Sequence, residues 1–445
     1  MQTKVIRILK RIQAKEKYQL IPHTKGFAYI CKKRLYMAWE KKSEEEIRAI
    51  VFNALDQNIN YSEKNVLGLP ASYLDEKVFS QDANFLKDAP FLTSLIKNPN
   101  HIGCHTLGSS ESFFAGTQEI EKDLIEICAN DILNGGEEAF DGYVASGGTE
   151  ANMQAIWIYR NNFIEEQKFK HNEICILCSA DNHYSMDKAA NILNVKIQKV
   201  AVDEDTRQIS KDTVHEAIKN QTEKGTKGFI VIANMMTTMF GSVDDPNCYT
   251  EVLEALDLPH FLHVDGAYGG FYFPFAQKEH LLDFRNPKVS SVTLDAHKMA
   301  QAPYGTGIFI IRKNLIHYAN TKEASYVEGE DYTLIGSRSG ANAVAVWMIL
   351  SKYGPFGWME KIFVLQKRTS WICEQLDRLN IEYYRHASSN IITMRAKHIP
   401  ADIARQFGLV PDNHNNPNWY KIVVMEHVTI EKAKPLIDAL ESLMD

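Results

Sequence analysis

Short apolar runs alternate with amphipathic stretches through the middle of the chain. Five runs have the length and the apolar content of buried strands: Glu173–Ala180, Lys196–Val202, Gly228–Met236, Phe261–Ala267 and Val289–His297. Helical patterns stand between several of them, notably at residues 183–193 and 212–224. Strands that alternate with helices are typical of a parallel sheet with crossover helices, so we predict an α/β fold.

The pattern changes on both sides of this region. Helical spacing is expected over Ser43–Ile59 and over residues 116–133, and a further strand over Tyr304–Lys313. From about residue 341 the pattern is helical, and the last hundred residues mix strands and helices. We therefore expect an N-terminal arm with a helical segment (1–100), a large domain (101–340) and a small α+β domain (341–445).

Composition and charge narrow the class of protein. The 445 residues are 45% apolar and 24% charged, which suits a globular chain that needs no disulfides for its core. The sequence has no uninterrupted apolar run of about 18 residues, so we expect no integral membrane segment. The net charge of −7 argues against a protein that coats nucleic acid.

The charge is unevenly distributed. Residues 1–39 contain ten Lys or Arg and one acid, so the arm carries +9 and the rest of the chain −16. An arm that packs on the acidic body or on a partner subunit explains this split with few assumptions. A membrane-surface helix and a transit peptide are the alternatives.

The seven cysteines are scattered and odd in number, which does not indicate a disulfide framework. Cys175 and Cys178 form a CxxC pair, but they lie within a predicted strand. Residues three apart on a strand point to opposite faces, so the pair is a poor metal clamp. We expect a reduced, cytoplasmic protein.

Chemistry-bearing residues stand where predicted strands end. Ser146–Glu150 is a glycine turn that opens a helix, Asp265 ends one strand, His297 and Lys298 end the next, and His183 follows an earlier one. Taken singly, these features would suit a tight turn, a helix cap, a surface lysine and a capping or core histidine. Jointly they are what pyridoxal phosphate needs: a phosphate cradle, a lysine for the aldehyde, an anion beside the pyridine nitrogen and a flat ring cover.

These motifs resemble those of the group II pyridoxal-phosphate decarboxylases, in the fold-type I, aspartate-aminotransferase-like superfamily. The resemblance runs from about Asn98 to Asp445 and is sharpest between Asp141 and Gly340. It implies a mostly parallel central sheet flanked by helices, with a small C-terminal α+β domain. It also implies cofactor contacts from ten residues: Gly147, Gly148 and Thr149 at the phosphate, His183 on the ring, Thr237 beside the cofactor, Asp265 at the pyridine nitrogen, Ala267 against the ring, His297 at the phosphate, Lys298 in the Schiff base, and Ser337.

Ser337 belongs to the segment Gly336–Gly340, which resembles the part through which family members reach the neighbouring subunit's phosphate. The resemblance therefore implies a homodimer with shared active sites; a simple helix-entry turn is the alternative reading. One departure from the family pattern is Met236, which stands where a glycine is usual before Thr237. We expect this replacement to reshape the pocket.

The expected reaction is the decarboxylation of an L-amino acid of the tyrosine, aspartate or glutamate type. The resemblance gives Tyr326 as the proton donor, with Tyr332 as the alternative, beside the catalytic Lys298, Asp265 and His183. His101 and His105 are expected to bind substrate; plain loop histidines, or a zinc site with Cys104, are the competing readings, and we expect no metal. Other lyases of the sphingosine-phosphate lyase type, an aminotransferase and a catalytically inactive scaffold are alternative functions.

Overall fold

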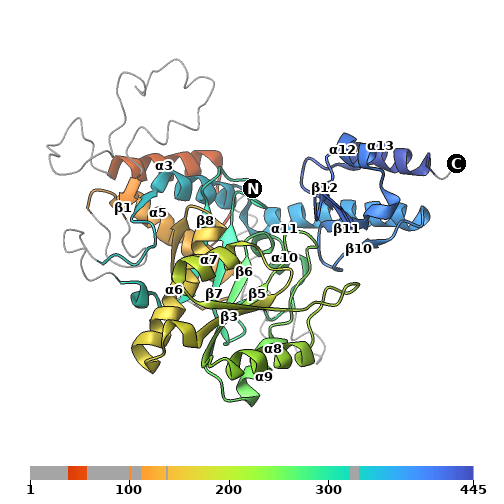
Figure 1. Ribbon diagram of the computed structural model, residues 1–445. Coiled ribbons are helices and arrows are strands. Elements are labelled where there is room, and N and C mark those ends of the chain that lie inside the picture. Colours follow the sequence, from red (N-terminus) through yellow and green to blue (C-terminus); the bar gives the residue numbers. More distant parts are fainter. Residues whose placement is uncertain (1–38, 58–99, 103–111, 137–138, 321–329, 444–445) are drawn as a thin grey trace, which may run out of the picture.

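The computed structural model describes residues 39–57, 100–102, 112–136, 139–320 and 330–443 (Figure 1). The basic arm lies outside these residues, so its expected packing stays a prediction. None of the helices that the structure describes combines the length and the apolar composition that crossing a bilayer needs.

A seven-stranded sheet forms the centre of the protein. Its strands, in spatial order, are β2 (Phe140–Ala145), β8 (Gly307–Arg312), β7 (Val289–Asp295), β6 (His260–Gly266), β5 (Gly228–Asn234), β3 (Ile174–Ser179) and β4 (Lys196–Val200). Neighbouring strands from β7 to β4 are parallel, whereas β8 runs antiparallel to both β2 and β7. The prediction of a mostly parallel sheet is confirmed, and β8 is the reversed strand.

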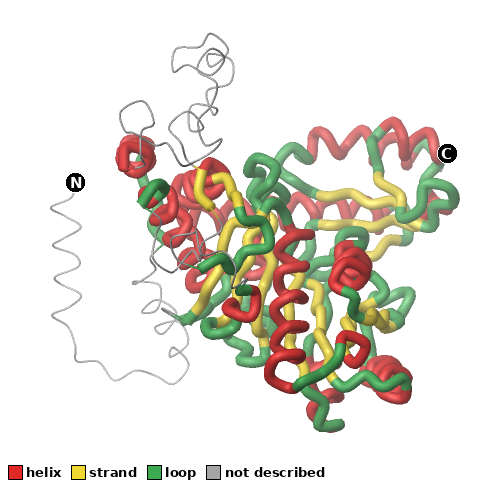
Figure 2. The backbone as a smooth tube through the Cα atoms, turned by 60° about the vertical axis from the view of Figure 1, so that its left-hand side comes forward, coloured by secondary structure: helices red, strands yellow, loops and turns green. Residues whose placement is uncertain are grey.

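Helices cover both faces of this sheet, which gives three layers (Figure 2). One face packs on α6 (Gly148–Gln167) and α7 (Ser185–Leu193). The other face packs mainly on four helices: α5 (Ala115–Glu126), α8 (Lys211–Glu223), α9 (Asn247–Ala255) and the first part of α11 (Gly340–Arg378).

The side chains of β3 show how the strand alternation serves both layers. Cys175 lies in the core beneath α8 and α9, and Cys178 lies in the core beneath α6 and α7. The two thiols therefore point to opposite faces, as predicted. Among the described residues, no three His, Cys, Asp or Glu side chains gather in a metal-binding arrangement.

A second, smaller sheet lies toward the C-terminus (Figure 1). Its antiparallel strands are β10 (Tyr383–Tyr384), β11 (Ile391–Arg395), β13 (Trp419–Val423) and β12 (Val410–Pro411), in that order. It shares a separate core with α12 (Ala401–Gln406), α13 (Ile430–Glu441) and the end of α11. The boundaries drawn at residues 100 and 340 stay predictions.

Helix α11 is broken at Gly354, whose φ of 60° is in the left-handed region. A Cβ at this glycine would lie 2.6 Å from Cβ of Lys41, so the close approach of the chain before α3 (Glu44–Gln57) requires a glycine here. Helix α3 begins with a capping box, in which Ser43 and Glu46 exchange hydrogen bonds between side chain and backbone.

A π-helical turn and a two-stranded sheet are also among the described elements. The helix predicted at residues 116–133 is α5 followed by a π-helical turn at Ile127–Ile132. Strand β1 (Asn100–Ile102) pairs antiparallel with β9 (Ser337–Ser339).

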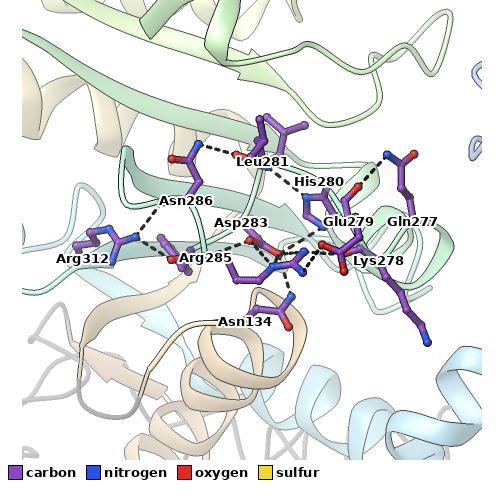
Figure 3. Close-up of polar contacts among 12 residues, drawn as sticks. Asn134, Gln277, Lys278, Glu279, His280, Leu281, Asp283, Arg285, Asn286 and Arg312 are labelled. Atoms are coloured by element: carbon purple, nitrogen blue, oxygen red, sulfur yellow. Dashed lines mark hydrogen bonds and ion pairs between the residues drawn. The ribbon is translucent and has the colours of Figure 1, made fainter. Parts of the chain in front are cut away.

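A polar cluster secures the edge of the sheet at which β7 begins and β8 ends (Figure 3). Asp283 is fully buried, and its carboxylate binds the Arg285 guanidinium and accepts a hydrogen bond from Asn134 Nδ2 at 2.9 Å. Arg312, at the end of β8, donates to the carbonyl oxygens of Phe284 and Asn286. The cluster thus ties the loop before β7 to the helical layer, on the edge opposite the carboxyl ends of the parallel strands.

Candidate active site

The carboxyl ends of β2, β3, β5, β6 and β7 meet at one edge of the sheet, because these strands run in the same direction. The predicted motifs follow at this edge: the glycine turn after β2, His183 after β3, Thr237 after β5, Asp265 within the end of β6, and Lys298 after β7. The topology therefore gathers residues that are up to about 150 positions apart in the sequence.

The glycine turn leads from β2 into the N-terminus of α6. Ser146 N donates to Glu150 Oε2 at 2.7 Å, which holds the turn against the first helical turn. A Cβ at Gly147 would meet no atom within 4 Å, so the space in front of the turn is open. Thr149 is half-buried beside it. Backbone N–H groups at a helix N-terminus and the positive end of the helix dipole make such a turn suitable for a phosphate.

Lys298 stands next to Asp295, a buried carboxylate that was not among the residues predicted from the sequence. Lys298 Nζ lies 3.7 Å from Asp295 Oδ2, beyond hydrogen-bond distance. His297 Nδ1 lies 2.7 Å from Asp295 Oδ1, and Gly148 N donates to Asp295 Oδ2 at 3.2 Å. Asp295 thus connects the end of β7 to the glycine turn. Its position three residues before the lysine was the signal available in the sequence.

Asp265 lies on β6 and is buried, with 7% of the residue's surface exposed. Its Oδ1 accepts from Ala267 N at 3.1 Å, and its Oδ2 accepts from Asn152 Nδ2 at 3.0 Å. Ala267 also faces the start of α6, since a Cβ at Gly148 would lie 3.1 Å from its Cβ. Both of these hydrogen bonds are donated to the carboxylate.

His183 lies within electrostatic range of Asp265, Asp295 and Lys298. Burial lowers the pKa of His183, the negative charges of Asp265 and Asp295 oppose this shift, and the positive charge of Lys298 adds to it. These interactions show that the four side chains converge. Ser185 holds the ring, with Oγ at 2.9 Å and the backbone N at 3.3 Å from His183 Nδ1.

The loop after β5 explains the departure at Met236. Met236 has φ of 70°, the left-handed conformation that a glycine adopts without strain. The backbone therefore keeps a conformation suited to glycine, and the methionine side chain is buried. Thr237 is also buried, and its Oγ1 lies 2.7 Å from Ser242 Oγ.

A residue of the small sheet reaches this loop, and no local motif signalled it. Lys421, on β13, donates from Nζ to the Thr238 carbonyl oxygen at 2.6 Å. Burial lowers the pKa of Lys421, and the positive charge of Lys298 lowers it further. The small sheet thus supplies a second cation within electrostatic range of Lys298.

Three of the remaining predicted residues belong to other segments, and two lie outside the described residues. Ser337 is exposed on β9, and the backbone of His101 pairs with Arg338 on the same two-stranded sheet. Tyr332 is half-buried, and its carbonyl oxygen accepts from Gln154 at 2.8 Å. His105 and Tyr326 lie outside the described residues, as does Cys104, so their predicted roles stay predictions.

Comparison with known proteins identifies this arrangement. Residues 120–392 match the pyridoxal-dependent decarboxylase conserved domain. The chain belongs to this family. The family resemblance inferred from the motifs is therefore confirmed, and the protein is a carboxy-lyase that acts on an amino acid with pyridoxal phosphate as its cofactor.

Individual relatives agree with this membership. A tryptophan decarboxylase of Clostridium sporogenes is 51% identical over 400 residues, which cover 90% of this chain and 96% of that protein. A probable L-tyrosine/L-aspartate decarboxylase of Methanosarcina barkeri is 26% identical over 86% of this chain and 98% of its own length. An L-aspartate/L-glutamate decarboxylase of Pyrococcus horikoshii is 30% identical over 74% of this chain and 83% of its own.

Solved structures show the same fold. L-methionine decarboxylase from Streptomyces sp. 590 superposes with a TM-score of 0.64 at 20% identity, over 78% of this chain and 86% of that one. Sphingosine-1-phosphate lyase of Burkholderia pseudomallei gives a TM-score of 0.66 at 17% identity, over 96% and 92% of the two chains. The fold prediction is confirmed, and a fold shared by a decarboxylase and a lyase does not choose between their reactions.

The residues at this sheet edge fit pyridoxal phosphate. The open glycine turn suits the phosphate, Lys298 has no hydrogen bond to Asp295 that would occupy its amine, and Asp265 presents an anion. When bound, the cofactor supplies an electrophilic aldehyde and a ring that withdraws electrons from the substrate α-carbon.

Proposed function

We propose that this pyridoxal-dependent decarboxylase acts on an aromatic L-amino acid, with L-tryptophan as its first candidate. The observation that carries this proposal is the 51% identity to a tryptophan decarboxylase over 90% of the chain, against 25–31% for the tyrosine, aspartate and glutamate decarboxylases compared with it. The motifs alone led us to expect tyrosine, aspartate or glutamate. The higher identity moves tryptophan ahead of them.

We assign the chemical roles as follows. Lys298 would hold the aldehyde, and the turn from Gly147 to Thr149 would bind the phosphate together with His297. Asp265 would keep a proton on the pyridine nitrogen by electrostatic attraction. His183 would cover the ring face. These residues are supported by their convergence at one sheet edge, with Asp295 and Lys421 as neighbours of Lys298.

A proton must return to the α-carbon after carbon dioxide leaves, and we propose Tyr326 as its donor. Tyr332 packs against the core beneath α6, and its backbone is fixed by Gln154. A tyrosine held in this way is the weaker candidate for a group that must approach the substrate. Tyr326→Phe should therefore lower kcat by about 100-fold, and Tyr332→Phe should change it little. The reverse order of effects would exchange the two assignments.

The substrate assignment can be tested by product analysis. Holo-protein is incubated separately with L-tryptophan, L-tyrosine, L-phenylalanine, L-aspartate, L-glutamate and L-methionine, and carbon dioxide and amine are quantified. We expect the highest kcat/KM for L-tryptophan, with tryptamine and carbon dioxide in equal amounts, and no turnover in Lys298→Ala. An acidic substrate with the highest kcat/KM would contradict the proposal, and a keto acid or an aldehyde would reveal a transaminase or a lyase reaction.

We propose that the enzyme is a homodimer in which Ser337 of one subunit serves the other subunit's phosphate site. The exposure of Ser337 on β9 supports this role. Subunit mixing tests it: Lys298→Ala and Ser337→Trp are each expected to be inactive. Reassociated mixtures should regain about a quarter of the wild-type activity, because half of the dimers contain one intact site. No recovery from mixtures that contain heterodimers would place both residues in the same subunit's site.

We also propose a cytoplasmic location. The described cysteines are all free thiols, which suits a reducing compartment. Cell fractionation followed by immunoblotting tests it, and recovery of the protein in a membrane or secreted fraction would contradict it.

A further inference from the structure

Asp265 and His183 are joined by two other side chains. Asn152, on the first turns of α6, donates from Nδ2 to Asp265 Oδ2 at 3.0 Å and to Ser185 Oγ at 3.2 Å. Ser185 Oγ lies 2.9 Å from His183 Nδ1. One amide group therefore contacts the carboxylate directly and the imidazole through a hydroxyl.

The hydrogen bonds that link Asn152, Ser185 and His183 can all be formed with only one assignment of donors and acceptors. Ser185 N can only donate, and it lies 3.3 Å from His183 Nδ1, so Nδ1 carries no hydrogen and the neutral ring has its hydrogen on Nε2. The Ser185 hydroxyl then donates to the same nitrogen and accepts from Asn152. The opposite orientation of the Asn152 amide would place its oxygen against the Asp265 carboxylate, where two acceptors repel.

The orientation of Asn152 is fixed from behind by His263. His263 is completely buried on β6, and its Nε2 lies 2.9 Å from Asn152 Oδ1, so Nε2 carries a hydrogen. Its Nδ1 lies 2.6 Å from Ser291 Oγ and must accept, and the Tyr159 hydroxyl forms a short hydrogen bond with the same serine. Thr293 Oγ1, 3.2 Å from Nε2, is a second acceptor for that ring hydrogen.

The ring of His263 is neutral in this setting. Burial lowers its pKa to about 3. The two ring nitrogens face a hydroxyl and an amide oxygen, and a neutral imidazole with its hydrogen on Nε2 satisfies both.

We propose that Asn152 and His263 are positioning residues, which hold the Asp265 carboxylate in its observed orientation and, through the Ser185 hydroxyl, stabilise the Nε2–H form of His183. Hydrogen bonds donated in one direction run from Tyr159 through Ser291, His263 and Asn152. At Asn152 the hydrogen bonds divide, one toward Asp265 and one through Ser185 toward His183. Asn152 lies outside the local motifs around Asp265 and His183, whereas His263 stands two residues before Asp265 on β6.

The test uses variants that preserve shape where possible. Asn152→Asp is isosteric and replaces the donor by an acceptor, and Asn152→Ala removes the group. His263→Gln retains a donor near the position of Nε2, whereas His263→Leu removes it. Asn162→Asp is the matched control, because Asn162 is a buried asparagine on the same helix that contacts Tyr318 instead.

The first measurement needs neither cofactor nor substrate. Apo-protein is labelled with ¹⁵N-histidine, and the ring signals of His183 are assigned by their loss in His183→Gln. We expect an unprotonated Nδ1 and a protonated Nε2 in the wild type and in Asn162→Asp. Both Asn152 variants should show a mixture of tautomers or a protonated ring. A wild-type pattern in both Asn152 variants would overturn the proposal.

The second measurement is kcat for the preferred amino acid, and only this arm rests on the proposed function. Loss of one hydrogen bond to a charged group is expected to lower kcat about 10- to 100-fold in Asn152→Ala, Asn152→Asp and His263→Leu. His263→Gln should stay within about 5-fold of the wild type, as should Asn162→Asp. An equal loss in His263→Gln and His263→Leu would overturn the role of His263, and unchanged kcat in all variants would overturn the proposal. If no amino acid is decarboxylated, the histidine signals still decide it.

Discussion

The burial of His263 has a consequence for stability in acid that can be calculated. The unfolded chain binds a proton at this residue with a pKa of 6.5, whereas burial lowers the folded-state pKa to about 3. Between these values the unfolded state binds more protons than the folded state, so the free energy of unfolding falls as the pH falls. The contribution of His263 is fully present above pH 6.5 and is lost progressively toward pH 3.

The magnitude follows from the two pKa values. From pH 7 to pH 5, proton binding by the unfolded chain at this one site lowers the free energy of unfolding by about 2 kcal/mol. Glutamine at position 263 does not titrate, so His263→Gln should lack this part of the pH dependence. The difference in stability between wild type and variant is therefore expected to change by about 2 kcal/mol over that interval.

Urea unfolding of the apo-protein at pH 7, 6 and 5, followed by circular dichroism, measures this difference. Apo-protein is used because cofactor binding would add its own pH dependence. His215→Gln is the control: this side chain is exposed on α8, so its replacement should leave the pH dependence as in the wild type. If His263→Gln and wild type lose stability in parallel from pH 7 to pH 5, His263 is not a buried neutral residue and the directional hydrogen-bond argument fails with it.

Three further predictions concern the sheet and its supports. Asp283→Ala removes a buried acceptor from the Arg285 guanidinium, which is itself 35% exposed, and should cost about 2 kcal/mol in the free energy of unfolding, measured by urea titration. Gly307→Ala would place a Cβ 2.3 Å from the Gly147 carbonyl carbon, so we expect weaker cofactor binding by fluorescence titration and a lower Tm. Cys175 and Cys178 should stay unmodified by a thiol reagent until the protein is unfolded, as peptide mapping would show, because burial raises the pKa of Cys175 to about 12 and that of Cys178 further.

Each of these three predictions has a control variant or an outcome that would contradict it. Glu279 is exposed and 3.7 Å from the Arg285 guanidinium, so Glu279→Ala should cost less than about 1 kcal/mol. A Cβ at Gly136 would meet no atom within 4 Å, so Gly136→Ala should leave cofactor binding unchanged. Modification of the folded protein at the β3 cysteines would show that the central sheet opens under native conditions.

The parts of the fold that the sequence predicted are those governed by local burial. The strand β5 is an apolar run buried on both faces, and such runs identify parallel strands before any contact is known. The direction of β8 was not predictable in this way, because a buried strand carries the same pattern whichever way it runs. Its reversal depends on the path of the chain between Lys298 and Gly307, which enters β8 from the same edge at which β7 ends.

The residues of the candidate site also fall into those that local sequence patterns predicted and those that they did not. Lys298, Asp265 and the glycine turn were accessible from the sequence because each lies in a short motif at the end of a predicted strand, and parallel strands bring their ends together. Asn152 carries no such signal, and His263, although two residues before Asp265, occupies an ordinary position of a buried strand. Asn152 lies on α6, about one helical turn after the glycine turn. This spacing does not indicate which strand of the sheet its side chain faces.

His263 shows why the supporting residues require three-dimensional structure. Two residues before Asp265 on the same strand, it points to the same face of the sheet as the carboxylate. An apolar residue would pack equally well at this position, so the pattern of burial does not indicate that a histidine has a role here. Its value lies in the hydrogen that Nε2 donates to Asn152, an interaction between β6 and α6 across 111 residues of sequence. The catalytic motif therefore names the groups that would contact the cofactor, while the packing of α6 on the sheet determines how those groups are oriented and protonated.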